Sequence, residues 1–374
     1  MDYNATAPHR AEVCAAIRDA LELAGNPSSV HAEGRAARAA VEAARADVAA
    51  LVGARPEQVV FTGSGSEANN LALSGLRPAR VMVSAVEHPS VLRPAAERTG
   101  AFVLLAVDGD GVVDLVGLER ALDNQASAGP SLVSVMLANN ETGVIQPVAD
   151  VVRLARAAGA RVHVDAVQGA GRMAIDFDAL GCDLMSVSAH KLGGPKGVGA
   201  LVVRGGLSLA PLVAGGGQER SLRAGTENVT GIVGFGAAAR VARAEVEAGT
   251  EPARQRALRD RIEAAVLASR NDAIILGAGT ARLGNTSCIA LPGARSDVQV
   301  MAFDLAGIAL SAGSACSSGK VEPSHVLDAM GLAPEIAGSV VRVSVGFGTT
   351  DADADAFIVA WQKICGAGAE RRSA

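Results

Sequence analysis

Charge of one sign, long apolar runs and leader-like features are all scarce in this chain of 374 residues. The formal net charge is only −5 and both signs are dispersed, which argues against a nucleic-acid groove or a charged membrane surface. No apolar run approaches the roughly 20 residues needed to span a bilayer. The first residues, Met1 to Asn4, lack the basic and apolar regions of a signal peptide. We therefore expect a protein that is neither exported nor inserted in a membrane.

Cysteine and aromatic side chains are also rare. The five cysteines are odd in number and far apart, which fits reduced thiols in a cytoplasmic protein better than a disulfide framework or a structural zinc site. No metal site is predicted. Aromatic residues make up 2 % of the chain, so its cores must be built from small aliphatic side chains. At this length, one domain of about 250 to 300 residues with a smaller one is expected.

Lysine is the rarest charged side chain, which makes one lysine informative. Lys191 is one of four in the chain and follows a strand pattern at residues 183–187. Asp165 follows another strand pattern, at residues 160–164, so both side chains lie where open α/β sheets bind ligands. A lysine amine forms a Schiff base with an aldehyde, and a carboxylate pairs with a protonated ring nitrogen. The two residues together therefore predict pyridoxal phosphate as cofactor.

Strand and helix patterns alternate from about residue 35 to residue 245. Strand patterns cover residues 59–61, 81–85, 102–107, 132–137, 161–164, 183–187 and 201–203, and helical patterns cover 36–52, 67–76 and 234–247. This alternation predicts an α/β fold, with a mainly parallel sheet covered by helices on both faces. The turn-rich residues 249–252 mark the predicted boundary between a large domain, residues 12–249, and a smaller α+β domain made of residues 1–11 and 250–374.

A Gly-rich turn at residues 61–68 runs from a strand into a helix. Backbone amides at such a helix start favour a phosphate, and Ser66 could add a hydroxyl. The same turn also matches the G-x-G-x-x-G/A dinucleotide fingerprint, and Glu87 lies where a ribose-binding acid belongs. An NAD-dependent oxidoreductase is therefore the rival hypothesis, although it leaves the acid and the lysine at the two other strand ends unexplained.

Other polar residues follow strands or interrupt them. Residues 139–143, Asn-Asn-Glu-Thr-Gly, follow one strand and form either an Asx-capped turn or a set of donors to a ring substituent. His88 ends another strand and is a candidate for ring stacking and acid–base work. Arg342 interrupts an apolar strand, either as a structural ion pair or as a clamp for a substrate carboxylate. Residues 311–319 hold only small side chains around Cys316, which predicts a mobile loop with a reactive thiol.

Together these segments resemble the cysteine desulfurases, which are pyridoxal-phosphate enzymes of the aspartate-aminotransferase fold type. The resemblance is carried by residues 2–8, 25–31, 87–88, 139–141, 163–165, 188–191, 223–228 and 314–318. It covers almost the whole chain in order, and the cysteine loop is similar to that of the group serving nitrogen fixation and general iron–sulfur assembly. The resemblance implies PLP-dependent transferase fold type I, with a seven-stranded sheet in the large domain, a mobile cysteine loop (about residues 311–320) in the small domain, and a homodimer.

The resemblance also implies a role for each site residue. Lys191 would bind the cofactor aldehyde and remove the α-proton of the substrate, Cys316 would take the sulfur, and His88 would stack on the ring and move protons. Arg342 and Asn140 would hold the substrate. Cofactor contacts are implied for Gly65, Ser66, His88, Asn140, Asp165, Gln168, Ser188, His190, Lys191 and, from the second subunit, Thr226.

The implied activity converts L-cysteine to L-alanine and leaves a persulfide on Cys316 for a sulfur acceptor or an iron–sulfur scaffold protein. A selenocysteine lyase, another class V pyridoxal-phosphate enzyme, an NAD-dependent oxidoreductase and a non-catalytic sulfur-assembly partner are the alternatives. Three departures from the family pattern stand out. Ser66 replaces Thr, Ala189 replaces Gly, and the chain ends soon after Trp361, where many relatives continue with a tail that docks a scaffold protein. The short tail bears on delivery to a scaffold and leaves the chemistry unaffected.

Overall fold

The computed structural model describes residues 1–97, 100–123, 130–312 and 324–366. The predicted cysteine loop begins in strand β10 (Ser311–Ala312). The part of it that carries Cys316 lies outside the described residues, so its mobility stays a prediction. Within the described ranges no helix is both long and apolar enough to cross a membrane.

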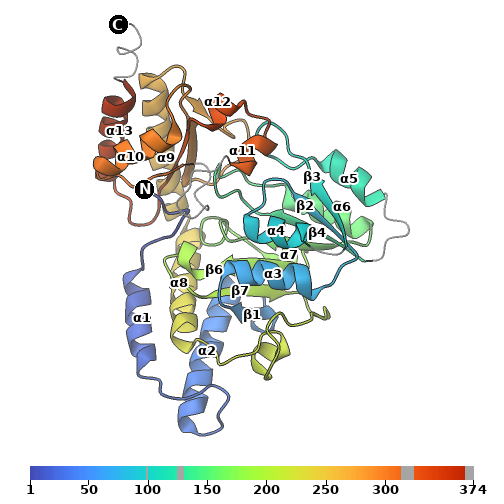
Figure 1. The fold of residues 1–374 in the computed structure, drawn as a ribbon. Coiled ribbons are helices and arrows are strands. Elements are labelled where there is room, and N and C mark those ends of the chain that lie inside the picture. The colour runs from blue at the N-terminus through green and yellow to red at the C-terminus, as the bar shows by residue number, and fades with distance from the viewer. Residues whose placement is uncertain (98–99, 124–129, 313–323, 367–374) are drawn as a thin grey trace.

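A seven-stranded sheet forms the centre of the larger part of the molecule (Figure 1). Its strands are β1 (Val59–Thr62), β2 (Arg80–Ser84), β3 (Ala101–Leu105), β4 (Ser131–Met136), β5 (Arg161–Asp165), β6 (Leu184–Ser188) and β7 (Gly199–Val203). They lie in the order β1-β7-β6-β5-β4-β2-β3, and β7 runs antiparallel to both of its neighbours while the other pairings are parallel. The predicted α/β fold with a mainly parallel sheet is confirmed.

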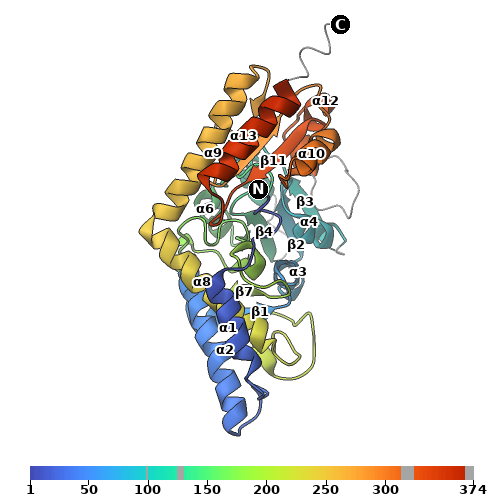
Figure 2. The ribbon, with the colours of Figure 1, turned by 90° about the vertical axis from the view of Figure 1, so that its left-hand side faces the viewer.

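Helices cover both faces of this sheet, and its central strands are therefore buried along their whole length. One face packs on α2 (Ala32–Leu51), α5 (Leu115–Asp123), α6 (Val148–Ala157) and α8 (Val229–Ala248). The other face packs on α3 (Gly65–Gly75) and α4 (Pro89–Ala96). Outside these layers, α1 (Ala11–Leu21) lies along α8, as Figure 2 shows. The connections include α7 (Phe177–Leu180) and the 3₁₀ turns η1 (Pro56–Gln58), η2 (Ala189–Lys191) and η3 (Gln218–Ser221).

A second, four-stranded antiparallel sheet forms the smaller part of the molecule, in the order β10-β11-β9-β8. Its strands are β8 (Ile274–Ile275), β9 (Thr286–Ala290), β10 and β11 (Val340–Ser344). The helices α9 (Thr250–Ser269), α10 (Ser296–Leu305) and α13 (Asp351–Gly366) pack on one face, and α11 (His325–Ala329) and α12 (Pro334–Ala337) lie against the other. Three of the chain's few aromatic rings, Phe303, Phe357 and Trp361, pack together in the core between α9, α10, α13 and this sheet.

Two stretches of the described chain run between the two sheets. Helix α8 ends at Gly249, whose φ of 70° suits glycine, and α9 continues from there toward the second sheet (Figure 2). This junction lies where the sequence places the domain boundary, which itself stays a prediction. The N-terminal segment makes the second connection, because Asp2 pairs with Ser344 of β11 and the amide of Ala7 donates to the carbonyl of His190. That segment therefore crosses directly over the carboxyl ends of the large sheet's strands.

Candidate active site

A cavity of about 250 Å³ lies where the carboxyl ends of the parallel strands meet the second sheet. Its volume is near the lower end of the roughly 300–1,000 Å³ typical of small-molecule sites. The loops after β1, β2, β4, β5 and β6 line it, together with β11 and the N-terminal segment. Of the site residues predicted from the sequence, the cavity brings together Gly65, Ser66, His88, Asn140, Asp165, Gln168, Ser188, His190, Lys191 and Arg342.

Lys191 and Asp165 reach the cavity from adjacent strands of the sheet. Lys191 lies in η2, directly after β6, and its Nζ donates to the carbonyls of Asn4 at 2.5 Å and Ala5 at 2.8 Å. Asp165 is the last residue of β5, and its Oδ2 accepts from Asn69 Nδ2 at 2.7 Å. The amide of Val167 donates to Asp165 Oδ1 at 3.0 Å. The carboxylate is thus buried, fixed in orientation and available to a ring cation.

The start of α3 gives the cavity a phosphate-binding end. Ser64 caps the helix by accepting from the amide of Glu67 at 3.1 Å, and the first-turn amides of Gly65 and Ser66 have no acceptor within the helix. A Cβ on Gly65 would lie 3.1 Å from Val167 Cγ2 and 3.2 Å from Ser188 Cβ, which is tighter than ordinary van der Waals contact, so glycine suits the close approach of the helix start to the end of β6. Backbone amides and two hydroxyls therefore converge on one end of the cavity.

His190 adds a neutral imidazole to this end of the site. Burial, reinforced by the nearby charges of Lys191, Lys196 and Arg172, lowers the pKa of His190 to about 4. Its Nδ1 lies 3.2 Å from Thr6 Oγ1, on the N-terminal segment. The ring is therefore uncharged near pH 7 and can donate a hydrogen bond to an anion without a proton being taken up.

His88 is the N-cap of α4 and also lines the cavity. Its Nδ1 accepts from the amide of Ser90 at 3.1 Å and lies 2.7 Å from Ser90 Oγ. Burial lowers the pKa of His88, the charge of Asp165 opposes that shift, and the charges of Lys191 and His325 reinforce it. A neutral imidazole is suited both to stacking on a ring and to proton transfer near neutral pH.

Residues 139–143 combine the two interpretations that their sequence left open. Asn139 forms the Asx turn, because its Oδ1 accepts from the amides of Glu141 at 2.8 Å and Thr142 at 3.0 Å. Asn140 is the member that lines the cavity, and its carbonyl accepts from Arg342 Nη1 at 3.0 Å. Glu141 points away into the protein, where Ser324 Oγ donates to it at 2.6 Å and burial raises its pKa to about 7.

Arg342 is both a structural ion pair and a lining residue of the cavity. Its side chain is 2 % exposed, and Nη2 lies 2.8 Å from Asp2 Oδ1 and 3.0 Å from Ser311 Oγ. Its Nε is buried without a hydrogen-bond partner among the described residues. A fixed guanidinium with an unused donor, facing a cavity that already holds a lysine, is suited to binding a carboxylate. Gln168, also in the cavity, donates from Nε2 to the carbonyl of Asn4 at 3.1 Å and accepts from Arg172.

Two predicted residues lie elsewhere. Thr226 is exposed and lines a different cavity of about 200 Å³, with Gly63 and Arg223. Glu87, the ribose-binding acid of the rival hypothesis, is fully buried, accepts from the amide of Met136 and does not line the main cavity. Burial, reinforced by the charge of Asp165, raises the pKa of Glu87 well above its usual value. The rival hypothesis was wrong on this residue, because the side chain turns inward under the strand end.

The residues that line the cavity without having been given a role from the sequence include Asn4, Asn69 and Ser90. Asn69 follows Gly65 by four positions, so the helical repeat places it on the same face of α3, and that spacing is a signal that could have found it. Ser90 follows His88 by two positions in the cap of α4. Asn4 belongs to residues 2–8, one of the segments that carry the family resemblance, but no periodic pattern marks it, because its position depends on the N-terminal segment crossing over from β11.

The donor set of the cavity fits pyridoxal phosphate. It offers a lysine amine for the aldehyde, a fixed carboxylate for the ring nitrogen, an imidazole beside the ring, and a helix start with hydroxyls for the phosphate. The fold and the site therefore define the class of pyridoxal-phosphate enzymes built on a mainly parallel α/β sheet. The chain belongs to the class-V aminotransferase family, whose model matches residues 1–357.

Individual relatives agree with this assignment. The chain is 40 % identical over 363 residues to the cysteine desulfurase IscS of Dictyoglomus turgidum, which covers 94 % of this chain and 91 % of the relative. Its fold is similar to that of a NifS-like protein from Rickettsia africae, with a TM-score of 0.90, 34 % identity and coverage of 97 % and 98 % of the two chains. It is also similar to SspA in complex with cysteine, with a TM-score of 0.79, 30 % identity and coverage of 92 % and 98 %.

Proposed function

We propose that this protein is a pyridoxal-phosphate-dependent cysteine desulfurase, which removes sulfur from L-cysteine and releases L-alanine. The observation that carries the proposal is one cavity that unites Lys191, Asp165 and Arg342, the three charged groups that an amino-acid substrate and this cofactor require. The relative from Dictyoglomus turgidum bears that name, and the similar protein SspA was solved in complex with cysteine.

Each of these side chains has a task in the reaction. Bound cofactor supplies an aldehyde for the substrate amine and a ring that accepts electrons from the substrate. Asp165 would hold the ring nitrogen protonated, since a carboxylate about 4 Å from a cation gains roughly 4 kcal/mol at an effective dielectric near 20. Lys191 Nζ would hold the cofactor aldehyde and, as a free amine, would take the α-proton of the substrate. Arg342 would bind the substrate carboxylate and so fix the orientation of the substrate in the cavity.

Cys316 is the proposed acceptor of the sulfur. Its thiolate attacks the substrate sulfur, an S–S bond forms as the C–S bond breaks, and the electron pair of the C–S bond stays with the carbon, which is protonated to give alanine. Cysteine and a thiol thus become alanine and a persulfide, with no outside oxidant or reductant. His88 is positioned to exchange protons beside the ring.

The other cysteines of the described part of the chain are poorly suited to that role. Burial raises the pKa of Cys182 and of Cys365 to about 12 and raises that of Cys288 further. Cys14 is exposed on α1 but does not line the cavity. The three buried thiols therefore have little thiolate character, and Cys14 lies away from the cavity, so none of these four is suited to attack a bound substrate. They are all free, in keeping with the cytoplasmic location that we propose.

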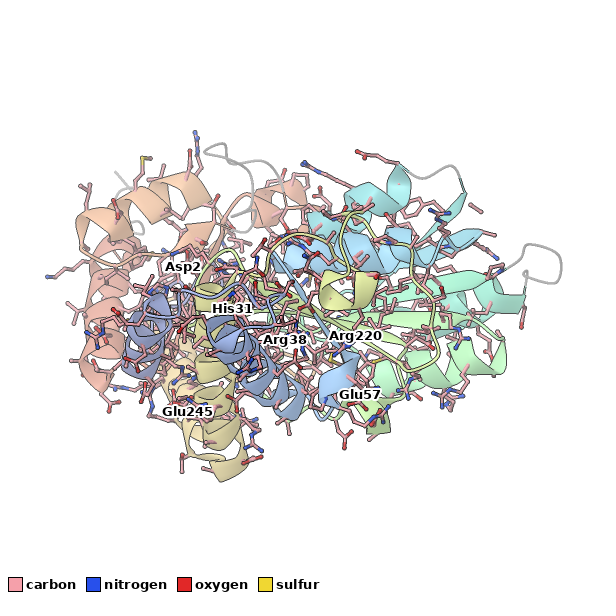
Figure 3. All side chains as sticks on the ribbon, turned by 90° about the horizontal axis from the view of Figure 1, so that it is seen from below. Asp2, His31, Arg38, Glu57, Arg220 and Glu245 are labelled. Carbon is pink, nitrogen blue, oxygen red and sulfur yellow. The ribbon has the colours of Figure 1, made fainter. Side chains whose placement is uncertain are left out.

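We also propose a homodimer in which Thr226 of each subunit serves the site of the other. Thr226 is exposed and lies outside the main cavity of its own subunit. Arg38 and Arg220, which Figure 3 labels, line a further cavity that shares Glu219 and Glu227 with the one lined by Thr226. A symmetric pair is the commonest oligomer. Mixing inactive Lys191→Ala subunits with inactive Thr226→Ala subunits should restore part of the activity, because one hybrid site carries neither change. An active enzyme that sediments strictly as a monomer would refute the dimer.

Delivery of the persulfide sulfur to an iron–sulfur scaffold or another acceptor protein is the further step that we propose. The direct test of the activity is to incubate the purified protein with pyridoxal phosphate, L-cysteine and a thiol reductant, and to measure alanine and sulfide together. We expect the two products in equal amounts, and neither from the Lys191→Ala variant. Release of pyruvate and ammonia instead of alanine, or of no product, would contradict the assignment.

A further inference from the structure

The ring of His88 is held by a hydrogen bond whose direction is fixed. The amide of Ser90 can only donate, and it donates to His88 Nδ1 at 3.1 Å. Nδ1 must therefore accept, which leaves it without a proton. This bond is the N-cap of α4, where Pro89 in the first position fixes the approach of the chain. A protonated ring at a helix start would also oppose the helix dipole, so the cap favours the neutral imidazole.

A second contact on the same nitrogen comes from the Ser90 side chain. Ser90 Oγ lies 2.7 Å from His88 Nδ1, and Asn69 Nδ2 donates to Ser90 Oγ at 2.9 Å. Because Nδ1 already accepts from the amide of Ser90 and carries no proton, the hydroxyl must donate its single proton to Nδ1 in this contact, while it accepts from Asn69. The hydroxyl therefore acts as a donor in this site rather than rotating between partners.

Asp165 sets the orientation of Asn69 in turn. Asn69 Nδ2 donates to Asp165 Oδ2 at 2.7 Å as well as to Ser90 Oγ, so both of its amide protons are used. Rotating the amide by half a turn would place Oδ1 against the carboxylate, which brings two acceptors together. A continuous path of hydrogen bonds with one direction therefore runs from the carboxylate of Asp165 through Asn69 and Ser90 to His88.

We propose that Asn69 and Ser90 are positioning residues that hold His88 as the neutral tautomer with its ring proton on Nε2. The inference rests on the proposed function for its consequence: His88 can give or take a proton only at Nε2, the ring nitrogen on the side away from Ser90. The path of hydrogen bonds also links the imidazole of His88 to Asp165, the carboxylate that would hold the cofactor nitrogen protonated. The charged and titratable groups that face His88 are Asp165 of β5, Lys191 of η2 and His325 of α11.

The test is nitrogen NMR of the protein loaded with cofactor and labelled with ¹⁵N-histidine. The chain has six histidines, and the His88 signals are assigned by their loss in the His88→Gln variant. We expect Nδ1 of His88 to show the shift of an unprotonated ring nitrogen and Nε2 that of a protonated one at pH 7.5. A proton on Nδ1 of His88 would overturn the proposal.

Variants then test the path itself. Ser90→Ala removes one donor to Nδ1 and should raise the apparent pKa of His88 by about half to one pH unit. Asn69→Leu should shift it in the same direction by less, and Ser90→Thr, which keeps the hydroxyl, should restore the original value. The matched control is Ser134→Ala, because Ser134 Oγ lies 2.8 Å from Nδ1 of another histidine, His163. It should leave the His88 titration unchanged.

A merely structural role would give a different result. Ser90→Ala would then lower thermal stability without moving the titration of His88, and that outcome would overturn the proposal. The pH dependence of kcat should shift with the NMR titration while KM for the substrate stays unchanged. The NMR readout does not depend on turnover, so a protein with the expected tautomer but no release of alanine would refute only the proposed function.

Discussion

His163 is a buried histidine at the centre of the large sheet, and its neutral form sets how the protein responds to acid. The side chain is 0 % exposed, with Nδ1 at 2.8 Å from Ser134 Oγ and Nε2 at 2.9 Å from Ser186 Oγ. Burial lowers the pKa of His163 from 6.5 to about 4, against a smaller opposing effect of the Asp165 charge. His163 in the unfolded chain titrates near its ordinary pKa of 6.5. Between pH 6.5 and about 4, the unfolded chain therefore binds a proton that the folded protein does not.

The lowered pKa of His163 determines whether the protein gains or loses stability as the pH falls. Above pH 6.5 the ring is neutral in both states and its contribution to stability is complete. As the pH falls from 6.5 toward 4, the unfolded chain takes up a proton that the folded protein does not bind, and stability is lost. The loss is about 1.4 kcal/mol per pH unit, or about 3 kcal/mol over the whole window. Below the folded pKa no further loss comes from this group.

The His163→Gln variant isolates the effect, because glutamine is polar and does not titrate. We expect urea unfolding at several pH values from 7.5 to 4.5 to show the stability of the wild type falling toward that of the variant. His190, whose pKa is also lowered to about 4, is present in both proteins and cancels in the difference. A difference in unfolding free energy between wild type and variant that stays constant over this range would refute the reasoning. A wild type that gains stability relative to the variant in acid would show that the predicted direction is wrong.

Three further predictions concern the cavity. Lys191→Ala should abolish turnover and leave the fold intact by circular dichroism, and borohydride reduction of the wild type should attach cofactor to the Lys191 peptide and to no other. Arg342→Ala should raise KM for cysteine by about 10- to 150-fold, the value of a charge-assisted hydrogen bond, while turnover of cysteamine, which lacks the carboxylate, should not change. An equal loss with both substrates would contradict a carboxylate site. Gly65→Ala should weaken cofactor binding by about tenfold by dialysis and absorbance, since its Cβ would press on Ser188, whereas Gly217→Ala, with open space around it, should have no effect.

Local patterns were enough to predict the large sheet and most of the polar residues at the carboxyl ends of its strands. Strands such as β4 and β6 are buried along their whole length and read as short apolar runs bounded by polar residues. Because parallel strands present their carboxyl ends at one edge, polar residues after several runs had to meet there. This is why His88, Asn140, Asp165 and Lys191 were predicted together and lie in one cavity.

The contacts that depend on distant segments could not be predicted in the same way. The ion pair of Arg342 with Asp2, at 2.8 Å, joins the second sheet to the first residues of the chain, and no periodic pattern encodes that pairing. The carbonyls of Asn4 and Ala5 that accept from Lys191 are backbone atoms, so their residue types carry little signal. Glu87 was open to the wrong interpretation because a strand pattern does not tell whether the residue at its end turns into a core or into a cavity.

The measurement that tests the central claim most directly is mass spectrometry of the protein after a brief reaction with L-cysteine. Alkylation and digestion should show one extra sulfur atom on the Cys316 peptide and none on the peptide of Cys14, the exposed cysteine among the described residues. Cys316→Ser should bind cofactor and change its spectrum when cysteine is added, yet release no alanine, whereas Cys14→Ser should turn over like the wild type. Extra sulfur on another cysteine, or normal turnover by Cys316→Ser, would contradict sulfur transfer through Cys316.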